Sequence, residues 1–357
     1  MENRWSFCAL ALFVCLCESA TAAVYQVTNL GVLTGGTFSG AQSINNNGQI
    51  TGTSEIAGGL TRAFLYSGGV MQDLGVTAGQ NSSVGNAINS SGHVAGSVNP
   101  NGFSAVLYDG TLHTIGNDSS NAFGLNDNDE AVGRSTTTTP SRHAVLFKNG
   151  TTQDLGALGT GKTSLAYGIN SAGTIVGVSA ISAAGSLPEH AFVYSSGVMH
   201  DLGTLGGQDS TALAINDAGQ ITGGANVDAG AYHAFLYDNG VMHDLGSLGG
   251  FSANGIGINS AGDIGGQSLL ADNATNHAFL YHSGVMQDLN SLIDPASGWV
   301  LNSATDINDA GQIVGSGLFN GQQRGFILTP VPEPSTYALT AVGIVALLAI
   351  KQRQSLA

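Results

Sequence analysis

Histidine and aspartate recur along this chain at a fixed spacing that could support acid-base or metal chemistry. Two residues are separated by 11 positions in each of five pairs: Arg62 and Asp73, His143 and Asp154, His190 and Asp201, His233 and Asp244, and His277 and Asp288. His233 and Asp244 lie at equal distances from Asp238-Asn239, so a two-residue hairpin turn there would place them directly opposite each other on one face. We therefore expect the members of each pair to be in contact.

The pattern of replacement favours a structural role for these pairs. At the equivalent positions the second copy has Ser104 and Thr114, and the seventh copy offers Arg324 and Asn29. The second copy loses both charges together, which is expected of a structural pair because one buried partner left unsatisfied costs about 1 to 3 kcal/mol. Metal binding and acid-base catalysis are the alternatives, although a catalytic site rarely needs several copies. We predict structural cross-strand pairs, no catalytic residue, no metal site and no cofactor.

The pairs belong to a repeat that is marked by an Ile-Asn or Leu-Asn step. The step begins at Ile44, Ile88, Leu125, Ile169, Ile215, Ile258 and Ile307, at intervals of 37 to 49 residues. Each unit reads as four short strands, and in residues 212–246 the first and last pairs are separated by Asn-Asp-Ala-Gly and Asp-Asn-Gly. These are hairpin-turn residues, and four strands in a unit of this length are typical of a propeller blade.

The two ends of the repeat region are complementary. The seventh unit stops after Arg324–Leu328 and lacks its fourth strand, whereas Tyr25–Gly31 matches the missing strand and precedes the first complete unit. Pairing these segments would close a ring and remove two exposed sheet edges. We predict an all-β fold, a seven-bladed β-propeller of four-stranded blades over residues 23–330, with the last blade closed by the N-terminal strand. A β-solenoid is the competing fold, but it would not need complementary ends.

The N-terminal segment has the features of a secretory signal peptide. Residues 1–22 contain Arg4, an apolar run over 5–16 and Ala-Thr-Ala at 20–22. All three cysteines, Cys8, Cys15 and Cys17, lie in this leader, so the exported protein would have no thiol or disulfide. A lipoprotein signal is the alternative, and it is disfavoured because a large residue precedes Cys15 and Cys17 where a small one is expected.

The C-terminal segment, residues 331–357, combines three parts. Val331, Pro332, Glu333 and Pro334 come first, followed by the apolar stretch 337–350 and a basic end with Lys351 and Arg353. This arrangement resembles the PEP-CTERM sorting signal of Gram-negative bacteria. The resemblance implies a short transmembrane helix and cleavage near Pro-Glu-Pro by an exosortase, usually in bacteria that make exopolysaccharide. Because the apolar stretch is shorter than the ~20 residues that span a bilayer, we expect transient tethering; a permanent tail anchor is the alternative.

The repeats also resemble a known family. The segments 202–207 (Leu-Gly-Thr-Leu-Gly-Gly), 214–221 (Ala-Ile-Asn-Asp-Ala-Gly-Gln-Ile) and 233–237 (His-Ala-Phe-Leu-Tyr) are similar to the bacterial extracellular HAF repeats. The similarity extends over nearly all of the repeat region. The family has no agreed catalytic residues, so the resemblance implies fold and location and adds no chemistry.

Several other motifs have a plain structural interpretation. Gly156–Thr163 matches the phosphate-loop pattern G-x-x-x-x-G-K-[ST], but a strand instead of a helix is expected after it, so we predict an ordinary link between repeats. Asn126–Glu130 lacks the Asp-x-Asp-x-Asp-Gly pattern of a calcium loop and is expected to be a hairpin turn. Three further histidines lie in or near fourth strands without metal-ligand spacing: His200, His243 and His282.

Charge and loop variation narrow the choice of function. A formal net charge of -15 would repel phosphate backbones, so nucleic acid is not an expected partner. The loops between second and third strands vary most, and variable loops on a rigid scaffold commonly carry recognition; these loops are 134–142, 178–189 and 267–276.

We therefore predict an exported, non-enzymatic propeller that an exosortase processes. It would act as an interaction module at the cell surface or in the exopolysaccharide matrix, with exopolysaccharide or other surface proteins as partners and membrane contact only through its C-terminal helix before processing. A carbohydrate-binding, lectin-like propeller is the second hypothesis. A polysaccharide lyase or hydrolase is the third.

Overall fold

The computed structural model describes residues 25–99, 103–136, 141–182, 188–228 and 230–331. The predicted signal peptide, the apolar C-terminal stretch and the sorting residues Pro332, Glu333 and Pro334 lie outside these residues. Across the described ranges, the structure contains no helix that is long and apolar enough to cross a membrane. Residues Tyr25–Pro330 form one structural unit.

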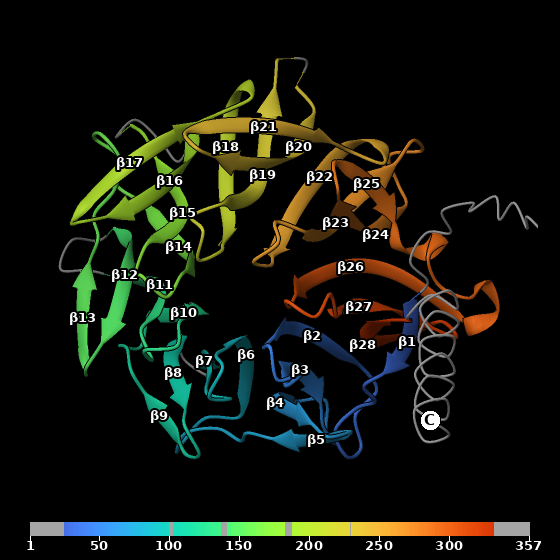
Figure 1. Ribbon diagram of the computed structural model, residues 1–357. Helices are drawn as coiled ribbons and strands as arrows, with labels where there is room; N and C mark the ends of the chain where they lie inside the picture. Colours follow the sequence, from blue (N-terminus) through green and yellow to red (C-terminus); the bar gives the residue numbers. More distant parts are fainter. Residues whose placement is uncertain (1–24, 100–102, 137–140, 183–187, 229, 332–357) are drawn as a thin grey trace, which may run out of the picture. The chain divides into compact units, whose positions relative to one another are not determined.

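This unit is a ring of antiparallel sheets around a central channel (Figure 1). The first sheets contain β2 (Ser39–Ile44), β3 (Ile50–Glu55), β4 (Thr61–Ser67) and β5 (Val70–Asp73), then β6 (Ser82–Ile88), β7 (Val94–Asn99), β8 (Ser104–Tyr108) and β9 (Leu112–Thr114). They are followed by β10 (Ser120–Leu125), β11 (Ala131–Thr136), β12 (Arg142–Lys148) and β13 (Thr151–Asp154), then β14 (Ser164–Ile169), β15 (Ile175–Ala180), β16 (Glu189–Ser195) and β17 (Val198–Gly203).

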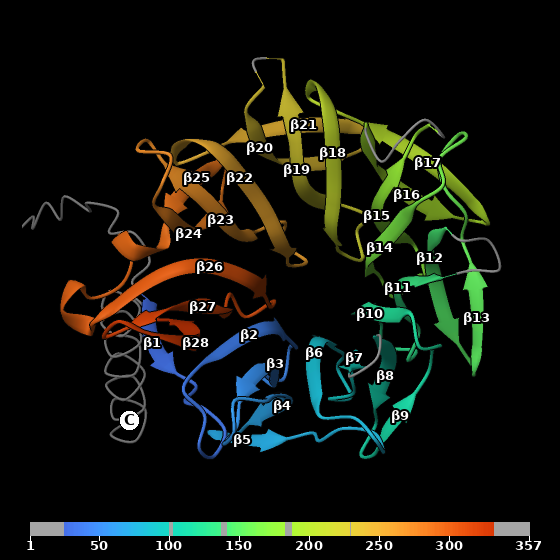
Figure 2. The same cartoon turned by 180° about the vertical axis from the view of Figure 1, so that it is seen from behind.

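The second half of the ring continues the same order. It contains β18 (Gly206–Ile215), β19 (Ile221–Val227), β20 (Tyr232–Asp238) and β21 (Val241–Gly246), then β22 (Gly249–Ile258), β23 (Ile264–Leu270), β24 (Asn276–His282) and β25 (Val285–Asp288). Two short 3-10 helices, η1 (Leu289–Ser291) and η2 (Pro295–Ser297), precede β26 (Trp299–Ile307), β27 (Ile313–Phe319) and β28 (Gln322–Pro330). The view from behind shows the same ring, with the first strand of each group nearest the channel (Figure 2).

Pairing follows the predicted repeat. Five sheets have four strands each, and β18–β25 form an eight-stranded sheet. Within the latter, β18–β21 and β22–β25 are two antiparallel groups joined by one parallel residue pair, Tyr232 with Ser252. The fold is therefore all-β and built from repeated four-stranded units, as predicted.

The first strand of the chain completes the last sheet. β1 (Tyr25–Asn29) pairs antiparallel with β28, from Tyr25 opposite Pro330 to Asn29 opposite Phe326, giving the order β1-β28-β27-β26. The predicted complementarity of the two ends is confirmed. This pairing covers the edge that β28 would otherwise expose.

The hairpins and the core explain why the repeat folds this way. In the β20–β21 hairpin, Asn239 and Gly240 have φ of 49° and 84°, the left-handed pair that a two-residue type I′ turn needs. The core is built largely from the phenylalanines of third strands and the isoleucines of second strands. The largest fully buried side chains include Phe64, Phe192, Phe235, Phe279, Phe326, Ile50, Ile175, Ile221, Ile264 and Ile313. Burying each such side chain contributes about 1.5 to 3 kcal/mol.

Candidate functional site

Two cavities occupy the channel, and the innermost strands line both. The first has a volume of about 250 Å³ and is lined mainly by the Ile-Asn and Leu-Asn steps and the residues that follow them. The second has a volume of about 470 Å³ and is lined mainly by residues one and two positions before those steps. Five residues line both cavities and so lie between them: Ile88, Leu125, Ile169, Ile215 and Asp306.

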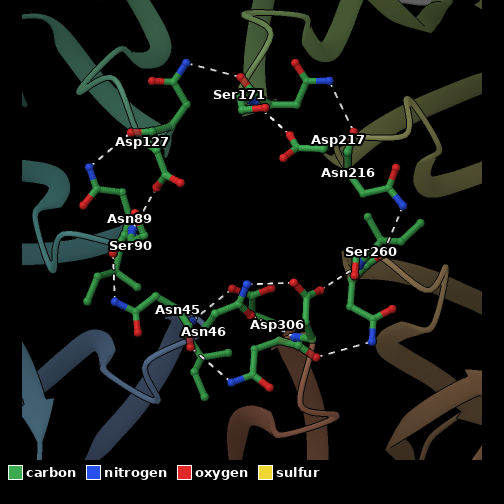
Figure 3. Close-up of a pocket in the computed structure, with 18 of the residues that line it drawn as sticks. Asn45, Asn46, Asn89, Ser90, Asp127, Ser171, Asn216, Asp217, Ser260 and Asp306 are labelled. Atoms are coloured by element: carbon green, nitrogen blue, oxygen red, sulfur yellow. Dashed lines mark hydrogen bonds between the residues drawn. The ribbon is translucent and has the colours of Figure 1, made fainter.

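A closed ring of asparagines surrounds the first cavity (Figure 3). The side-chain Nδ2 of each step asparagine donates to the backbone carbonyl of the next one, at 2.8 to 3.3 Å. The order is Asn45, Asn89, Asn126, Asn170, Asn216, Asn259, Asn308 and back to Asn45. All seven are buried. The ring therefore connects every repeat to its neighbour, including the last repeat to the first.

Each asparagine also holds its own turn. The Asn308 Oδ1 accepts the backbone N–H groups of Ala310 and Gln312 at 3.1 and 3.0 Å. Its Nδ2 donates to the Gln312 Oε1 at 2.9 Å and to the Asn45 carbonyl at 3.1 Å. Fully satisfied polar networks of this kind rigidify a structure. In the sequence the Ile-Asn step marks only the period of the repeat, and its role in linking repeats has no local signal.

The residues that directly follow the asparagines line the same cavity and alternate between serine and aspartate at all positions but one. They are Asn46, Ser90, Asp127, Ser171, Asp217, Ser260 and Asp309. Each aspartate Oδ1 accepts the backbone N–H of the preceding serine in the ring, at 2.8 or 2.9 Å. Asn46 interrupts the alternation: its Oδ1 accepts the Asp309 N–H at 2.9 Å, and its Nδ2 donates to the Asp309 Oδ2 at 2.7 Å.

The second cavity is not symmetric. The residues two positions before each step differ in kind: Gln42, Asn86, Phe123, Tyr167, Leu213, Ile256 and Thr305. The rings of Phe123 and Tyr167 contact each other, with centroids 5.6 Å apart and planes inclined at 49°. Leu213 and Ile256 follow them in ring order and extend the apolar wall. The remaining three residues bring amide and hydroxyl groups to the other side of the cavity.

Asp306 is the acidic residue between the two cavities. Its Oδ2 accepts the Ser43 hydroxyl at 2.8 Å and the Ile44 N–H at 3.0 Å, and its Oδ1 accepts the Ile307 N–H at 2.9 Å. Burial raises the pKa of Asp306 to about 6, although these three hydrogen bonds act in the opposite direction. The carboxylate therefore links β26 of the last sheet to β2 of the first.

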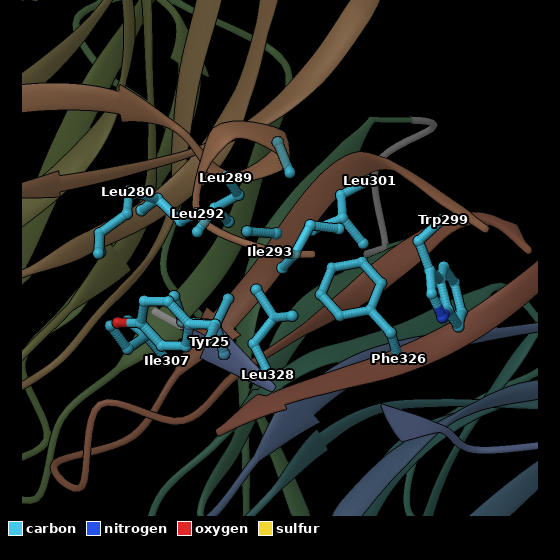
Figure 4. Packing of buried hydrophobic residues seen from close by; sticks show 13 residues of the cluster. Tyr25, Leu280, Leu289, Leu292, Ile293, Trp299, Leu301, Ile307, Phe326 and Leu328 are labelled. Carbon is cyan, nitrogen blue, oxygen red and sulfur yellow. The ribbon is translucent and has the colours of Figure 1, made fainter. Parts of the chain in front are cut away.

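The last sheet has an enlarged core beside this link (Figure 4). Tyr25 from β1 packs into the same cluster as Phe326 and Leu328 from β28. The Trp299 ring lies against Phe326, with centroids 5.8 Å apart and planes at 78°. Trp299 is 9% exposed, so this tryptophan is a packing residue here.

A group of ionisable residues lies at the edges of two predicted recognition loops, 134–142 and 178–189. The Arg134 Nε donates to the Asn121 Oδ1 at 3.1 Å, and burial, together with the nearby Arg142, lowers the pKa of Arg134. Burial and the neighbouring Asp209 raise the pKa of Glu189. Residues 137–140 and 183–187 of these loops lie outside the described residues.

The third predicted loop, 267–276, is described throughout. The Asn276 Nδ2 donates to the Gln267 Oε1 at 3.3 Å, which ties the two ends of the loop together. The same Nδ2 lies 3.2 Å from the Asn302 carbonyl of the next sheet. This loop is therefore fixed to its neighbour.

The structure brings each predicted pair together. The histidine Nδ1 lies 2.7 to 2.9 Å from the nearest aspartate oxygen in His143–Asp154, His190–Asp201, His233–Asp244 and His277–Asp288. The Arg62 Nε lies 3.9 Å from the Asp73 Oδ2. The side chains of the paired histidines are 17 to 23% exposed, so the contacts are partly open to solvent.

The predicted register of these pairs was wrong. Asp244 lies opposite Phe235, and Asp238 lies opposite Val241, so the turn is Asn239-Gly240 instead of Asp238-Asn239. The left-handed residues determine the turn, and His233 reaches Asp244 diagonally. The aspartates have a second partner that the sequence analysis missed, because the Asp244 Oδ1 accepts the Gly246 N–H at 2.7 Å.

The pair expected across the closing strands does not form in the predicted way. The Arg324 Nη1 donates to the Thr37 carbonyl, and its Nη2 donates to the Gln322 Oε1. The Asn29 Oδ1 accepts the Gly31 N–H at 2.9 Å. Asn29 thus makes the same turn contact as the repeated aspartates but carries no charge, and Arg324 forms its hydrogen bonds with other residues.

The other motifs have structural partners. After Gly156–Thr163 comes strand β14, as predicted, and the Ser164 hydroxyl donates to the Gly156 carbonyl at 2.5 Å. The Asn126 Oδ1 accepts the Glu130 N–H at 3.0 Å, which closes a hairpin turn. His282 is the last residue of the third strand β24 and lies opposite Val285 of the fourth strand, and its Nδ1 is 2.7 Å from the Asp263 Oδ1.

The acidic residues beside the first cavity are engaged in hydrogen bonds. The described part of the chain contains no group of three histidine, cysteine, aspartate or glutamate residues that could hold a metal ion. Asp127, Asp217 and Asp309 line the first cavity, but each accepts a backbone N–H of its ring neighbour.

Comparison with known proteins supports the fold. A family profile described as "Protein of unknown function (DUF3466)" matches residues 116–331. No curated protein matches the chain. The β-propeller domain of the Trilobed protease from Pyrococcus furiosus, described as having an open velcro topology, is similar with a TM-score of 0.55 and 9% identity, over 86% of this chain and 94% of that one. Unlike an open ring, the present structure pairs β1 with β28.

Two other solved structures align less closely. A puromycin-hydrolyzing peptidase from Mycobacterium tuberculosis has a TM-score of 0.49 and 11% identity; the alignment covers 72% of this chain but only 45% of the peptidase. YCF48 bound to D1 peptide has a TM-score of 0.49 and 13% identity, over 88% of this chain and 97% of that one.

Proposed function

This chain belongs to the DUF3466 family, whose description assigns no activity, and we propose that it is a non-enzymatic binding module built as a seven-bladed β-propeller. The blade count rests on treating β18–β21 and β22–β25 as separate blades, because a single parallel residue pair joins them. The seven linked asparagines support the same count, one for each blade.

The contrast between repeated scaffold and unrepeated cavity carries this proposal. The asparagine ring recurs in every blade and a buried apolar side chain recurs in every third strand, phenylalanine in five blades and Val106 and Val145 in the other two, whereas the side chains that line the second cavity differ in kind. A scaffold role alone would not require an aromatic wall and a polar wall in one chamber. Cavities with a mostly apolar lining and a few polar groups are the usual sites of small ligands.

A binding role also fits the acidic groups of the chamber better than a hydrolytic role. Glycoside hydrolysis uses two carboxyl groups that face each other across the bond to be cleaved. Among the described residues that line the second cavity, Asp306 is the one carboxylic acid, and it already accepts three hydrogen bonds. We therefore rank the hydrolase hypothesis below binding.

The cellular setting of this module is part of the proposal. The signal-peptide features of residues 1–22 and the PEP-CTERM resemblance of residues 331–357 support export, processing by an exosortase and release to the cell surface or the exopolysaccharide matrix. Val331, the first residue of the sorting motif, is 44% exposed and follows β28 directly, which is compatible with access for a processing enzyme. Exopolysaccharide is the partner that this setting favours.

Binding to the cognate polymer tests the proposed function. We expect the purified full-length protein to be retained on exopolysaccharide from its own bacterium, and the double variant Phe123→Ala/Tyr167→Ala to lose that retention. Thr152→Ala, on the exposed strand β13, serves as the matched control and should bind like the unmodified protein. Equal retention of the double variant and the control would refute a binding site in the channel.

A further inference from the structure

We propose that the second cavity binds one pyranose ring, with the apolar face of the sugar against Phe123 and Tyr167 and its hydroxyl groups toward the polar wall. This inference rests on the proposed function and adds the chemical class of the ligand. It concerns a single sugar unit, either free or as part of a longer chain.

The size of the cavity suits such a ligand. Its volume of about 470 Å³ falls within the ~300 to 1,000 Å³ that small-molecule sites usually occupy. All of its lining residues belong to innermost strands. A site on strands is better preorganised than a site on loops.

The apolar wall contains two aromatic rings. Phe123 on β10 and Tyr167 on β14 are both partly exposed to the channel and contact each other at 5.6 Å between centroids. Leu213 and Ile256 continue this wall around the ring. One face of a pyranose carries mainly C–H groups, and covering it with aromatic rings removes apolar surface from water.

The opposite wall offers donors and acceptors together. Within the described residues, the amide group of Gln42 has no hydrogen-bond partner, and its side chain is exposed to the cavity. The Asn86 Nδ2 donates to the Ala122 carbonyl at 2.7 Å, which leaves its side-chain oxygen able to accept. A sugar hydroxyl both donates and accepts, so it can pair with either kind of group.

The same lining argues against other ligand classes. The described residues that line the second cavity include no lysine, arginine or histidine, so no lining side chain would supply a counter-charge to a phosphate or sulfate group. A flat apolar ligand would fill the aromatic side but would desolvate Gln42 and Asn86 without pairing them, which is unfavourable. A ring with one apolar face and several hydroxyls satisfies both walls.

Calorimetric titration with simple glycosides tests this inference. The probes are the methyl glycosides of glucose, galactose, mannose and fucose, added to the full-length protein at millimolar concentration, with p-cresol as an aromatic probe that has no sugar ring. We expect at least one glycoside to bind, and Tyr167→Ala to weaken that binding at least tenfold. Tyr167→Phe should keep most of it, because the ring face is retained.

Two further variants keep the test independent of folding. Gln42→Ala is on the exposed polar side and should weaken glycoside binding several-fold with an unchanged thermal midpoint, whereas Thr152→Ala should change neither quantity. Binding of p-cresol with no binding of any glycoside would overturn the sugar assignment and leave a channel-binding module in place. Failure of every probe, while exopolysaccharide is still retained through Phe123 and Tyr167, would also overturn it. Retention that ignores both residues would instead refute the proposed function.

Discussion

Replacing one asparagine of the ring should destabilise the whole propeller, and Asn308 is the most informative position because it joins the last repeat to the first. The Asn308→Ala variant loses four hydrogen bonds of 2.9 to 3.1 Å. Each hydrogen bond contributes roughly 1 kcal/mol net, and the loss is smaller where water from the first cavity replaces the missing partner. We therefore expect the free energy of unfolding to fall by about 3 kcal/mol. Urea unfolding followed by circular dichroism measures this change.

The Asn308→Asp variant separates the two halves of the asparagine's role. Its carboxylate keeps the Oδ1 acceptor for the two N–H groups of the turn, but it places an oxygen against the Asn45 carbonyl and the Gln312 Oε1, which need a donor. At pH 7 this variant should be at least as unstable as Asn308→Ala, and acidification should restore part of its stability because a protonated carboxyl can donate again. Thr152→Ala should stay within about 0.5 kcal/mol of the unmodified protein. A loss below about 1 kcal/mol for both Asn308 variants would refute the view that the ring holds the repeats together.

Three further predictions concern the seam and the surface pairs. The folded-state pKa of Asp306 is raised to about 6 from 3.8, so the contribution of Asp306 to stability is greatest at low pH and falls as the pH rises through that window. Asp306→Ser, which copies Ser43 of the first repeat, lacks this titration. Between pH 4 and pH 7.5, its free energy of unfolding in urea titrations should therefore gain up to about 3 kcal/mol relative to the unmodified protein. Tyr25→Ala removes a buried ring from the closing strand and should cost about 3 kcal/mol, seen as a lower thermal midpoint; an unchanged midpoint would contradict closure by β1. His233→Gln should lower the free energy of unfolding by less than about 1 kcal/mol, because its pair with Asp244 is partly exposed. Asp244→Ala should lower it by more, because the Gly246 N–H also loses its acceptor. Equal losses for the two variants in chemical unfolding would argue against this second role of Asp244.

The sequence predicted the features of the fold that depend on local signals. Turn residues and apolar strands recur within each unit, so the four-stranded units were readable, and the incomplete seventh unit pointed to Tyr25 as its partner. The position of the hairpin turn was misjudged by one residue, because both Asp238-Asn239 and Asn239-Gly240 are plausible turn pairs. Only the left-handed φ values of Asn239 and Gly240 distinguish them.

The site was much harder to read from the sequence. The asparagine ring depends on contacts between residues such as Asn45 and Asn89, which lie in different repeats and meet only after the ring has formed. Phe123 and Gln42 each lie two residues before a Leu-Asn or Ile-Asn step, but only the folded ring brings these positions to a common cavity, so the difference between them carries no functional signal in the sequence alone. Variation in length marks the loops in the sequence, whereas the described cavity is lined by strands.

The alternation that follows the asparagines has a consequence for how such a chain can grow. Strict alternation of serine and aspartate is impossible around a ring with an odd number of members. Asn46 occupies the one position where the alternation breaks, and its side-chain amide supplies both the acceptor and the donor that Asp309 needs. Adding or removing two repeats would keep the number of members odd and would keep this break in the alternation. One added repeat with serine at this position, inserted between Asp309 and Asn46, would make the break unnecessary. The odd number of members in the ring is thus accommodated by one side chain, Asn46, where the last repeat contacts the first.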